Sequence, residues 1–278
     1  VRDRMYGVIL LAFFLIFFFM SFEQGATSLV LVARDYVDRQ LVGNSLIIFN
    51  VVNTLLTIVP LGIISWVLVI LAKKTYTKIP ASMLVLFSCF LLIWLAAIWM
   101  LYNEFTAEVS ESKVSWFSIL NSFFIIALAS TVSKIWDSKY NPSAAFKYGI
   151  GLLLVAIGFL ILGLGALGAD SGVKISITFL VLTYLFHTLG ELFISPVGLS
   201  YVSKLVPARM LAFMFGMWYL AIAIAQKLAA ILGGQVEVIQ ANYSLSHFFF
   251  LFTAIPAIGG ILVMLLNPII KKLMQGVK

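Results

Sequence analysis

Long apolar runs alternate with short polar segments along the whole chain. A helix needs about 20 predominantly apolar residues to cross the hydrocarbon core of a bilayer. Eight runs reach that length, and each is predicted to form a membrane-spanning helix. They cover residues 5–33, 45–72, 80–102, 115–136, 143–168, 174–203, 207–233 and 245–270. The pattern therefore predicts an all-α polytopic membrane protein.

The composition agrees with this fold class and orients the chain. Of the 278 residues, 63% are hydrophobic and only 10% are charged, a balance that excludes a soluble globular domain. The net charge is +7, and most lysines and arginines fall in alternate connections, on one side of the predicted membrane. The positive-inside rule places that side and both termini in the cytoplasm of a cell (inner or plasma) membrane. This excess accounts for the charge, so no nucleic-acid partner is predicted.

Few charged residues lie at membrane depth. Away from their ends, the eight runs hold two carboxylates, Glu23 and Glu191, and one lysine, Lys227. A charged side chain there costs roughly 2.5–3.5 kcal/mol on insertion scales, so each is by default a functional-site hypothesis. Pro196 lies five residues after Glu191 and has no N–H, so the helix can kink and leave the carbonyl of Leu192 free. The pattern indicates a polar pathway through the bundle.

The residues around Glu191 are also unusual for a lipid-facing helix. His187, Glu191 and Ser195 follow one another at intervals of four and therefore form one stripe. His187 either bonds within the bundle or tunes the protonation of Glu191.

The two histidines are far apart, and neither zinc spacing nor a nucleotide-binding loop occurs, so no metal or cofactor is predicted. Glycines in the run 149–168 predict close helix packing.

Several motifs together resemble one family, the proton-dependent oligopeptide transporters, a branch of the major facilitator superfamily. Residues 190–200, Gly-Glu-Leu-Phe-Ile-Ser-Pro-Val-Gly-Leu-Ser, resemble its tenth-helix signature, and residues 22–25, Phe-Glu-Gln-Gly, resemble its seventh-helix motif. The other matches are to its eighth helix, its eighth-to-ninth connection, its eleventh helix and the end of its twelfth: residues 116–121, 141–152, 216–218 and 268–276. The motifs occur in the family's order over most of the chain.

The resemblance implies only the second half of such a transporter. Residues 1–40 would hold family helix seven, residues 114–278 would hold helices eight to twelve, and residues 41–113 would form an inserted transmembrane hairpin with an external loop. The first-half motif, of the type Glu-x-x-Glu-Arg-Phe-x-Tyr, is absent, and the chain begins with valine. We therefore expect the C-terminal six-helix bundle of a longer protein; a separately encoded half is the alternative.

The implied function is proton-coupled symport of di- and tripeptides, which needs no enzymatic chemistry. The expected partners are a small peptide, protons, the lipid bilayer and the missing N-terminal half. One alternative is a relative that moves another small metabolite. Another is a non-transporting membrane subunit that docks a partner through the hairpin.

The resemblance also implies roles for substrate-binding residues. Glu191 would bind the peptide's amino terminus, the alternative being a structural ion pair with a neighbouring helix. Ser195 would donate a hydrogen bond to the substrate or to a carbonyl one turn back. Trp218 resembles the pocket tryptophan, although core packing explains it equally. Asn121 would bond the peptide backbone; an alternative alignment places Asn53 at that position.

Two further residues concern the proton. Glu23 would take part in proton coupling, since a buried carboxylate can take up and release a proton during the transport cycle. An interhelical hydrogen bond is its alternative role. Lys227 matches no charged position of the family, so it either extends to the membrane surface or pairs with an acid in the cavity.

Overall fold

The computed structural model describes residues 2–107, 110–136, 138–139 and 141–275, and it is almost wholly helical. This part of the chain contains eight helical segments long and apolar enough to cross a membrane. They are Arg2–Asp35, Asn44–Thr75, Pro80–Thr106, Val114–Trp136, Ala144–Ser171, Ile177–Leu205, Ala208–Asn242 and Leu245–Leu265. The predicted all-α architecture with eight spans is confirmed.

The chain divides into two compact units. The first unit combines residues Val1–Asp38 and Lys113–Lys278, and the second is the continuous segment Arg39–Ser112.

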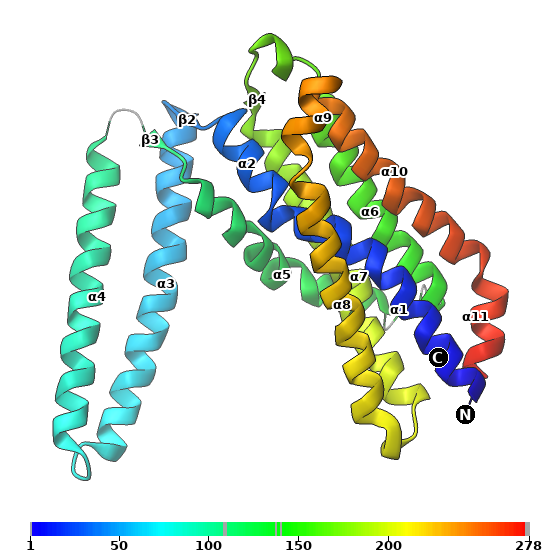
Figure 1. The fold of residues 1–278 in the computed structure, drawn as a ribbon. Helices are drawn as coiled ribbons and strands as arrows, with labels where there is room; N and C mark the ends of the chain where they lie inside the picture. The colour runs from blue at the N-terminus through cyan, green and yellow to red at the C-terminus, as the bar shows by residue number, and fades with distance from the viewer. Residues whose placement is uncertain (1, 108–109, 137, 140, 276–278) are drawn as a thin grey trace. The chain divides into compact units, whose positions relative to one another are not determined.

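The first unit is a bundle of helices joined by short turns (Figure 1). Its opening span is divided into three pieces, α1 (Arg2–Phe22), the 3-10 turn η1 (Glu23–Ala26) and α2 (Ser28–Asp35). The remaining elements, in chain order, are β1 (Val37–Asp38), α5 (Val114–Trp136), α6 (Ala144–Gly165), η2 (Ala169–Ser171), β4 (Ile175–Ser176), α7 (Ile177–Leu205), η3 (Ala208–Met210), α8 (Leu211–Gly233), α9 (Val236–Asn242), α10 (Leu245–Leu265) and α11 (Asn267–Met274).

The centre of this bundle is α6, which packs between α7 and α10. A Cβ atom added to Gly190 of α7 would lie 2.6 Å from the carbonyl oxygen of Gly151 on α6. The same closeness recurs where Gly149 of α6 faces Gly260 of α10, since a Cβ on either would lie 2.9 Å from the other's carbonyl oxygen. Glycine at these positions lets the helix backbones touch, as the glycine-rich run predicts.

Hydrogen bonds at one end of the bundle tie α2 to distant segments. The short strand β1 pairs in parallel with β4, Val37 beside Ile175. The Lys174 ammonium donates to the carbonyl oxygen of Asp35 at 2.6 Å. The Tyr36 hydroxyl donates to Gln240 Oε1 at 2.6 Å, so α2 is also fixed to α9. These bonds restrain the end of the segment that carries η1.

The second unit is a helical hairpin. It contains β2 (Gln40–Leu41), α3 (Asn44–Thr75), α4 (Pro80–Thr106) and β3 (Ser110–Glu111). The two helices lie side by side in Figure 1, and β2 pairs antiparallel with β3. Polar bonds also join the two helices: the Trp94 indole N–H donates to Ser65 Oγ at 2.9 Å, and Asn53 Nδ2 donates to Glu104 Oε2.

Most side chains of the hairpin helices are exposed. Only four of their residues are buried, namely Leu46, Asn50, Met83 and Ala97. The single cysteine, Cys89, is exposed on α4. The hairpin therefore has no core of its own beyond the seam between its two helices, and its apolar surface suits contact with lipid.

Candidate functional site

Helix α7 carries the Glu191 region and is continuous from Ile177 to Leu205, so it runs through Pro196 without an interruption. Ser176 caps its start by accepting a hydrogen bond from the backbone N–H of Thr178. Glu191 lies near the middle of this helix and is half-buried. The span therefore holds a carboxylate at depth on an unbroken helix.

Glu191 is bonded to a neighbouring helix by an asparagine. The Asn121 amide, on α5, donates from Nδ2 to Glu191 Oε2 at 3.2 Å. The Thr188 hydroxyl donates to Asn121 Oδ1 at 2.6 Å and so holds the amide with its NH₂ group toward the carboxylate. Among the described residues Glu191 makes no ion pair. The amide of Asn121 thus orients the carboxylate, but no cation among the described residues neutralises its charge.

The span that carries Glu23 changes conformation at that residue. Glu23 is the first residue of η1, which separates α1 from α2. The buried Gln24 amide donates to the carbonyl oxygens of Met20 and of Ala229 on α8, at 3.2 and 3.0 Å. The Tyr184 hydroxyl on α7 donates to the carbonyl oxygen of Gly25 at 2.9 Å. A break at membrane depth exposes backbone polar groups, and the bonds to Met20 and Gly25 satisfy two carbonyl oxygens of the broken span.

The carboxylate of Glu23 contacts α8. Gln226 Nε2 donates to Glu23 Oε1 at 3.1 Å. Glu23 also lies near enough to Glu191 for their negative charges to repel each other. The two acids, which are far apart in the sequence, are therefore parts of one polar region lined by α5, α7, α8 and η1.

The stripe predicted on α7 does not face one direction. His187 is buried against α6, with its ring centroid 4.5 Å from that of Phe159, and Ser195 Oγ is buried without a hydrogen-bond partner among the described residues. Only Glu191 of the three bonds to Asn121. Each step of four residues turns an α-helix by about 40°, so the first and last members point some 80° apart. This geometry favours a packing role for His187.

The structure places the other candidate residues in different surroundings. Trp218 is buried against α7, because a Cβ at Gly198 would lie 2.4 Å from its indole Cζ2. Lys227 is exposed on α8 and makes no ion pair with a described residue. Asn53 belongs to the hairpin, where it bonds to Glu104. Of the two candidate asparagines, only Asn121 contacts Glu191.

Three contacting residues were not predicted from the sequence: Thr188, Gln226 and Tyr184. Thr188 lies one turn before Glu191 on α7, and that spacing was an available signal. Gln226 and Tyr184 act on a segment more than a hundred residues away, and no local pattern indicates such partners.

With this geometry established, comparison with known proteins gives the family. The model of the POT family matches residues 107–249, just over half of the chain. The chain belongs to the POT family. It corresponds to the C-terminal part of a POT transporter, and it is an integral membrane protein.

Curated relatives of the POT family match over part of their length. The uncharacterized transporter YclF of Bacillus subtilis is 36% identical over 169 residues, which is 60% of this chain and 33% of YclF. The di-/tripeptide transporter of Lactococcus lactis subsp. cremoris is 36% identical over 167 residues, 59% of this chain and 33% of the relative. Dipeptide and tripeptide permease A of Proteus mirabilis is 29% identical over 243 residues, which is 79% of this chain and 49% of the permease. The chain thus spans about a third to a half of the relatives it matches.

Solved structures give the same fold. The crystal structure of the peptide transporter POT in complex with sulfate aligns with a TM-score of 0.66 at 24% identity, covering 99% of this chain and 42% of that one. A mutant of the peptide transporter POT in complex with alafosfalin aligns with a TM-score of 0.53 at 31% identity, covering 62% of this chain and 34% of the mutant's chain. The six-helix bundle expected from the resemblance is the fold of these transporters.

Proposed function

We propose that this chain is the C-terminal half of a proton-coupled symporter of di- and tripeptides. The observation that carries the proposal is the carboxylate of Glu191, half-buried in the middle of a membrane span and without a cation among the described residues. A buried charge in that state is stabilised by a cationic partner. The ammonium group of a peptide's amino terminus would be such a cation. The Asn121 amide already orients the carboxylate that would bind it.

The relatives support peptides as the substrate class. The matched proteins from Lactococcus lactis and Proteus mirabilis are named as transporters of di- and tripeptides. In our proposal Asn121 forms hydrogen bonds with the peptide backbone once Glu191 has bound the ammonium group. The amide of Asn121 carries both donors and an acceptor for these bonds. Ser195, whose hydroxyl is without a described partner, and Trp218 complete the substrate site from α7 and α8.

Proton coupling is assigned to Glu23. It is half-buried, sits at a helix break and bonds to a neutral amide, Gln226, that can accompany either protonation state. In our proposal the proton resides on Glu23 while the ammonium of the peptide is held at Glu191, so that the two cross the membrane together. His187 and Lys227 have no part in the proposal, since neither contacts these acids.

The N-terminal half is required for the complete cycle. Transporters of this architecture bind substrate near the bilayer midplane at the interface of two repeats. We propose that the other half supplies the cation for the peptide's carboxylate, so that this chain does not transport alone. The basic connections are proposed to face the cytoplasm, together with both termini, in the cell membrane.

The test is Glu191→Gln in the intact transporter. Glutamine keeps the size and hydrogen bonding of the side chain but removes the charge. We expect the affinity for a dipeptide to fall roughly 10–150-fold, the equivalent of a charge-assisted hydrogen bond of about 1.5–3 kcal/mol. Binding of the same dipeptide with an acetylated amino terminus should change little, because it lacks the ammonium group.

The hairpin offers a matched control. Glu104 is also a carboxylate bonded to an asparagine, Asn53, but it lies in the second unit. Glu104→Gln should leave dipeptide affinity unchanged. Equal losses for free and acetylated peptide would indicate misfolding of the site, and an unaltered affinity in Glu191→Gln would remove Glu191 from the substrate site.

A second candidate function is favoured by the exposed apolar surface of the hairpin, which suits a docking subunit. In that case deletion of residues 41–112 would abolish assembly with a partner. The symporter proposal expects the deletion variant to retain peptide binding.

A further inference from the structure

The side-chain amide of Gln24 is fully buried at the break between α1 and α2. A primary amide has two N–H donors and an oxygen that can accept two hydrogen bonds. The Gln24 Nε2 donates to the carbonyl oxygens of Met20 and Ala229, at 3.2 and 3.0 Å. Its Oε1 accepts from the Ser28 hydroxyl at 2.7 Å and has the Thr27 hydroxyl at 3.1 Å. Because every donor and acceptor has a partner, the amide is held in one orientation.

The amide lies against α8 at a glycine. A Cβ atom added to Gly233 would lie 2.9 Å from Gln24 Oε1 and 2.8 Å from Thr27 Oγ1. Gly233 is helical and its φ is negative, so it is the close approach of η1, and not the backbone conformation, that excludes a side chain here. The next residue, Gly234, is different: a Cβ there would be 3.4 Å from its nearest neighbour, an ordinary contact.

The contacts with η1 follow one face of α8. Gln226 donates to Glu23 Oε1, Ala229 accepts from Gln24, and Gly233 lies against Gln24. These three residues of α8 follow one another at intervals of three and four, which places them on one stripe of the helix. Glu23 and Gln24 are therefore both turned toward the same stripe.

The other end of α2 is fixed independently. The Tyr36 hydroxyl donates to Gln240 of α9, and the Lys174 ammonium donates to the carbonyl oxygen of Asp35. The pairing of β1 with β4 adds a third restraint. Helix α2 has only eight residues, and its far end is held by these bonds. We therefore expect a displacement of Gln24 to be passed to the adjacent Glu23 and not to be absorbed by a movement of α2.

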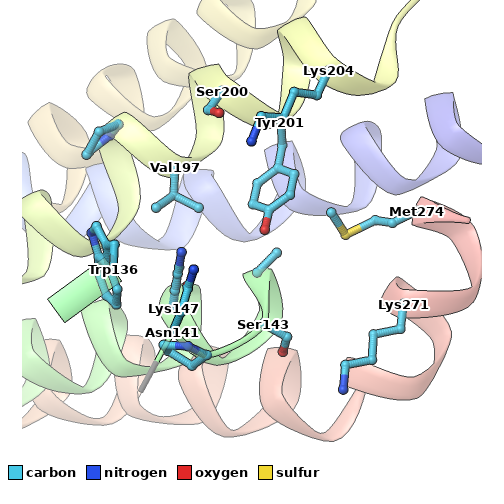
Figure 2. A pocket seen from close by; sticks show the side chains of 13 residues that line it. Trp136, Asn141, Ser143, Lys147, Val197, Ser200, Tyr201, Lys204, Lys271 and Met274 are labelled. Atoms are coloured by element: carbon cyan, nitrogen blue, oxygen red, sulfur yellow. The ribbon is translucent and has the colours of Figure 1, made fainter. Parts of the chain in front are cut away.

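The bonds that hold Gln24 come from packed helices and not from the contents of a cavity. The cavity drawn in Figure 2 lies between α6 and α7, and its described walls include Lys147, Tyr201 and Lys204. No residue of η1 is among those described walls. The orientation of the Gln24 amide is thus set by the chain itself.

We infer that Gln24 is a positioning residue for proton transfer at Glu23, with Gly233 as the space that admits its amide. The inference rests on the proposed role of Glu23 as the proton carrier. Gln24 carries no proton itself. By bonding to Ala229 it holds η1 against α8, so that the adjacent carboxylate meets Gln226.

The experiment compares Gly233→Ala with Gly234→Ala in the intact protein in liposomes. It measures uphill dipeptide uptake, counterflow and equilibrium dipeptide affinity. The Cβ in Gly233→Ala displaces Gln24, so the ratio of uphill uptake to counterflow should fall roughly fivefold or more, as expected for the loss of one or two hydrogen bonds. The affinity should be unchanged, because neither Glu191 nor Asn121 is touched.

Gly234→Ala is the matched control, because it adds the same methyl group one residue further along, where there is room for it. It should keep the wild-type ratio. An unchanged ratio in Gly233→Ala, or an equal fall in both variants, would overturn the inference.

A second pair of variants removes hydrogen bonds and adds no atoms to a glycine. Gln24→Met keeps the length of the side chain and removes all its bonds, and it should show the same selective fall in the ratio. Thr183→Val removes two bonds from a buried side chain of α7 away from η1, and it should leave the ratio unchanged. If both variants lowered the two transport modes in equal proportion, Gln24 would be a structural residue only and the inference would be wrong.

Glu23→Gln separates this inference from the proposed function on which it rests. If Glu23→Gln kept uphill uptake at the wild-type rate, the proton-carrying role of Glu23 would fail, and the inference would fail with it. If Glu23→Gln abolished uphill uptake while Gly233→Ala and Gln24→Met kept the wild-type ratio, only the positioning role of Gln24 would fail.

Discussion

The hydroxyl of Thr188 has one hydrogen but two acceptors within reach. Asn121 Oδ1 lies 2.6 Å away and the carbonyl oxygen of Tyr184 lies 2.7 Å away. When the hydrogen points to Asn121, the amide presents its NH₂ group to Glu191, as observed. When the hydrogen points to Tyr184, the amide can turn and present its oxygen to a protonated Glu191. We therefore expect Thr188 to let one asparagine serve both protonation states of the acid.

Thr188→Val should disturb this arrangement without changing the shape of the side chain. Asn121 loses the bond that orients it, so dipeptide affinity in the intact protein should fall roughly 2–12-fold, the equivalent of about 0.5–1.5 kcal/mol. Equilibrium binding at several pH values is the measurement. The variant should also show a weaker pH dependence of affinity.

A second threonine on α7 provides the control. Thr183 is buried and donates to the carbonyl oxygens of Gly158 and Phe179, away from Asn121. Thr183→Val should alter stability but neither the affinity nor its pH dependence. If both variants changed binding alike, the role assigned to Thr188 would be wrong.

At this scale the sequence predicts the charged residues better than their partners. Glu191 and Glu23 stand out because a carboxylate is costly in an apolar run. Gln226 and Thr188 are ordinary polar residues among many others, and their contacts follow from the way helices are turned in the bundle. His187 shows the converse: its spacing from Glu191 suggested a shared function, but the rotation of the helix turns it toward Phe159.

At the scale of the element, the contact between α6 and α7 decides how closely the Glu191 region is held. A Cβ at Gly190 would lie 2.6 Å from the backbone oxygen of Gly151, and a backbone atom cannot move aside as a flexible side chain does. Gly190 is also adjacent to Glu191 in the chain. Its size is therefore needed for the position of the acid.

Gly190→Ala should force the two helices apart. We expect a loss of about 1–3 kcal/mol, measured as a fall of roughly 2–10 °C in the unfolding temperature of the intact protein. Gly216→Ala is the matched control, because Gly216 is also helical but has open space where a Cβ would lie. That change should be neutral or slightly stabilising, since alanine favours the helix by about 1 kcal/mol. Equal effects of the two substitutions would contradict the close approach.

The spans could be predicted from hydropathy because each needs only length and apolar composition. The interruption at Glu23 could not. It depends on Gln24 bonding to Ala229 and on Tyr184 bonding to Gly25, partners that are 205 and 159 residues apart in the sequence. Pro196 does not end α7, and the helix continues to Leu205.

At the scale of the whole molecule, the two acids differ in how they are bonded. Glu191 is held by a side chain of α5 on an unbroken helix, and Glu23 is held by α8 at a break. The proposed symporter uses this difference, with Glu191 for the substrate and Glu23 for the proton. The chain spans a third to a half of its matched relatives, and in our proposal the working unit includes the other half.

The most direct test of this account compares two transport modes of the intact protein in liposomes, wild type and Glu23→Gln. Uphill dipeptide uptake requires the pH gradient, whereas counterflow exchanges peptide for peptide without net proton movement. Glutamine preserves the bond from Gln226 but binds no transferable proton. We predict that Glu23→Gln abolishes uphill uptake and keeps a substantial part of counterflow. Uphill accumulation at the wild-type rate in Glu23→Gln would contradict the account, because the proton would then be carried elsewhere.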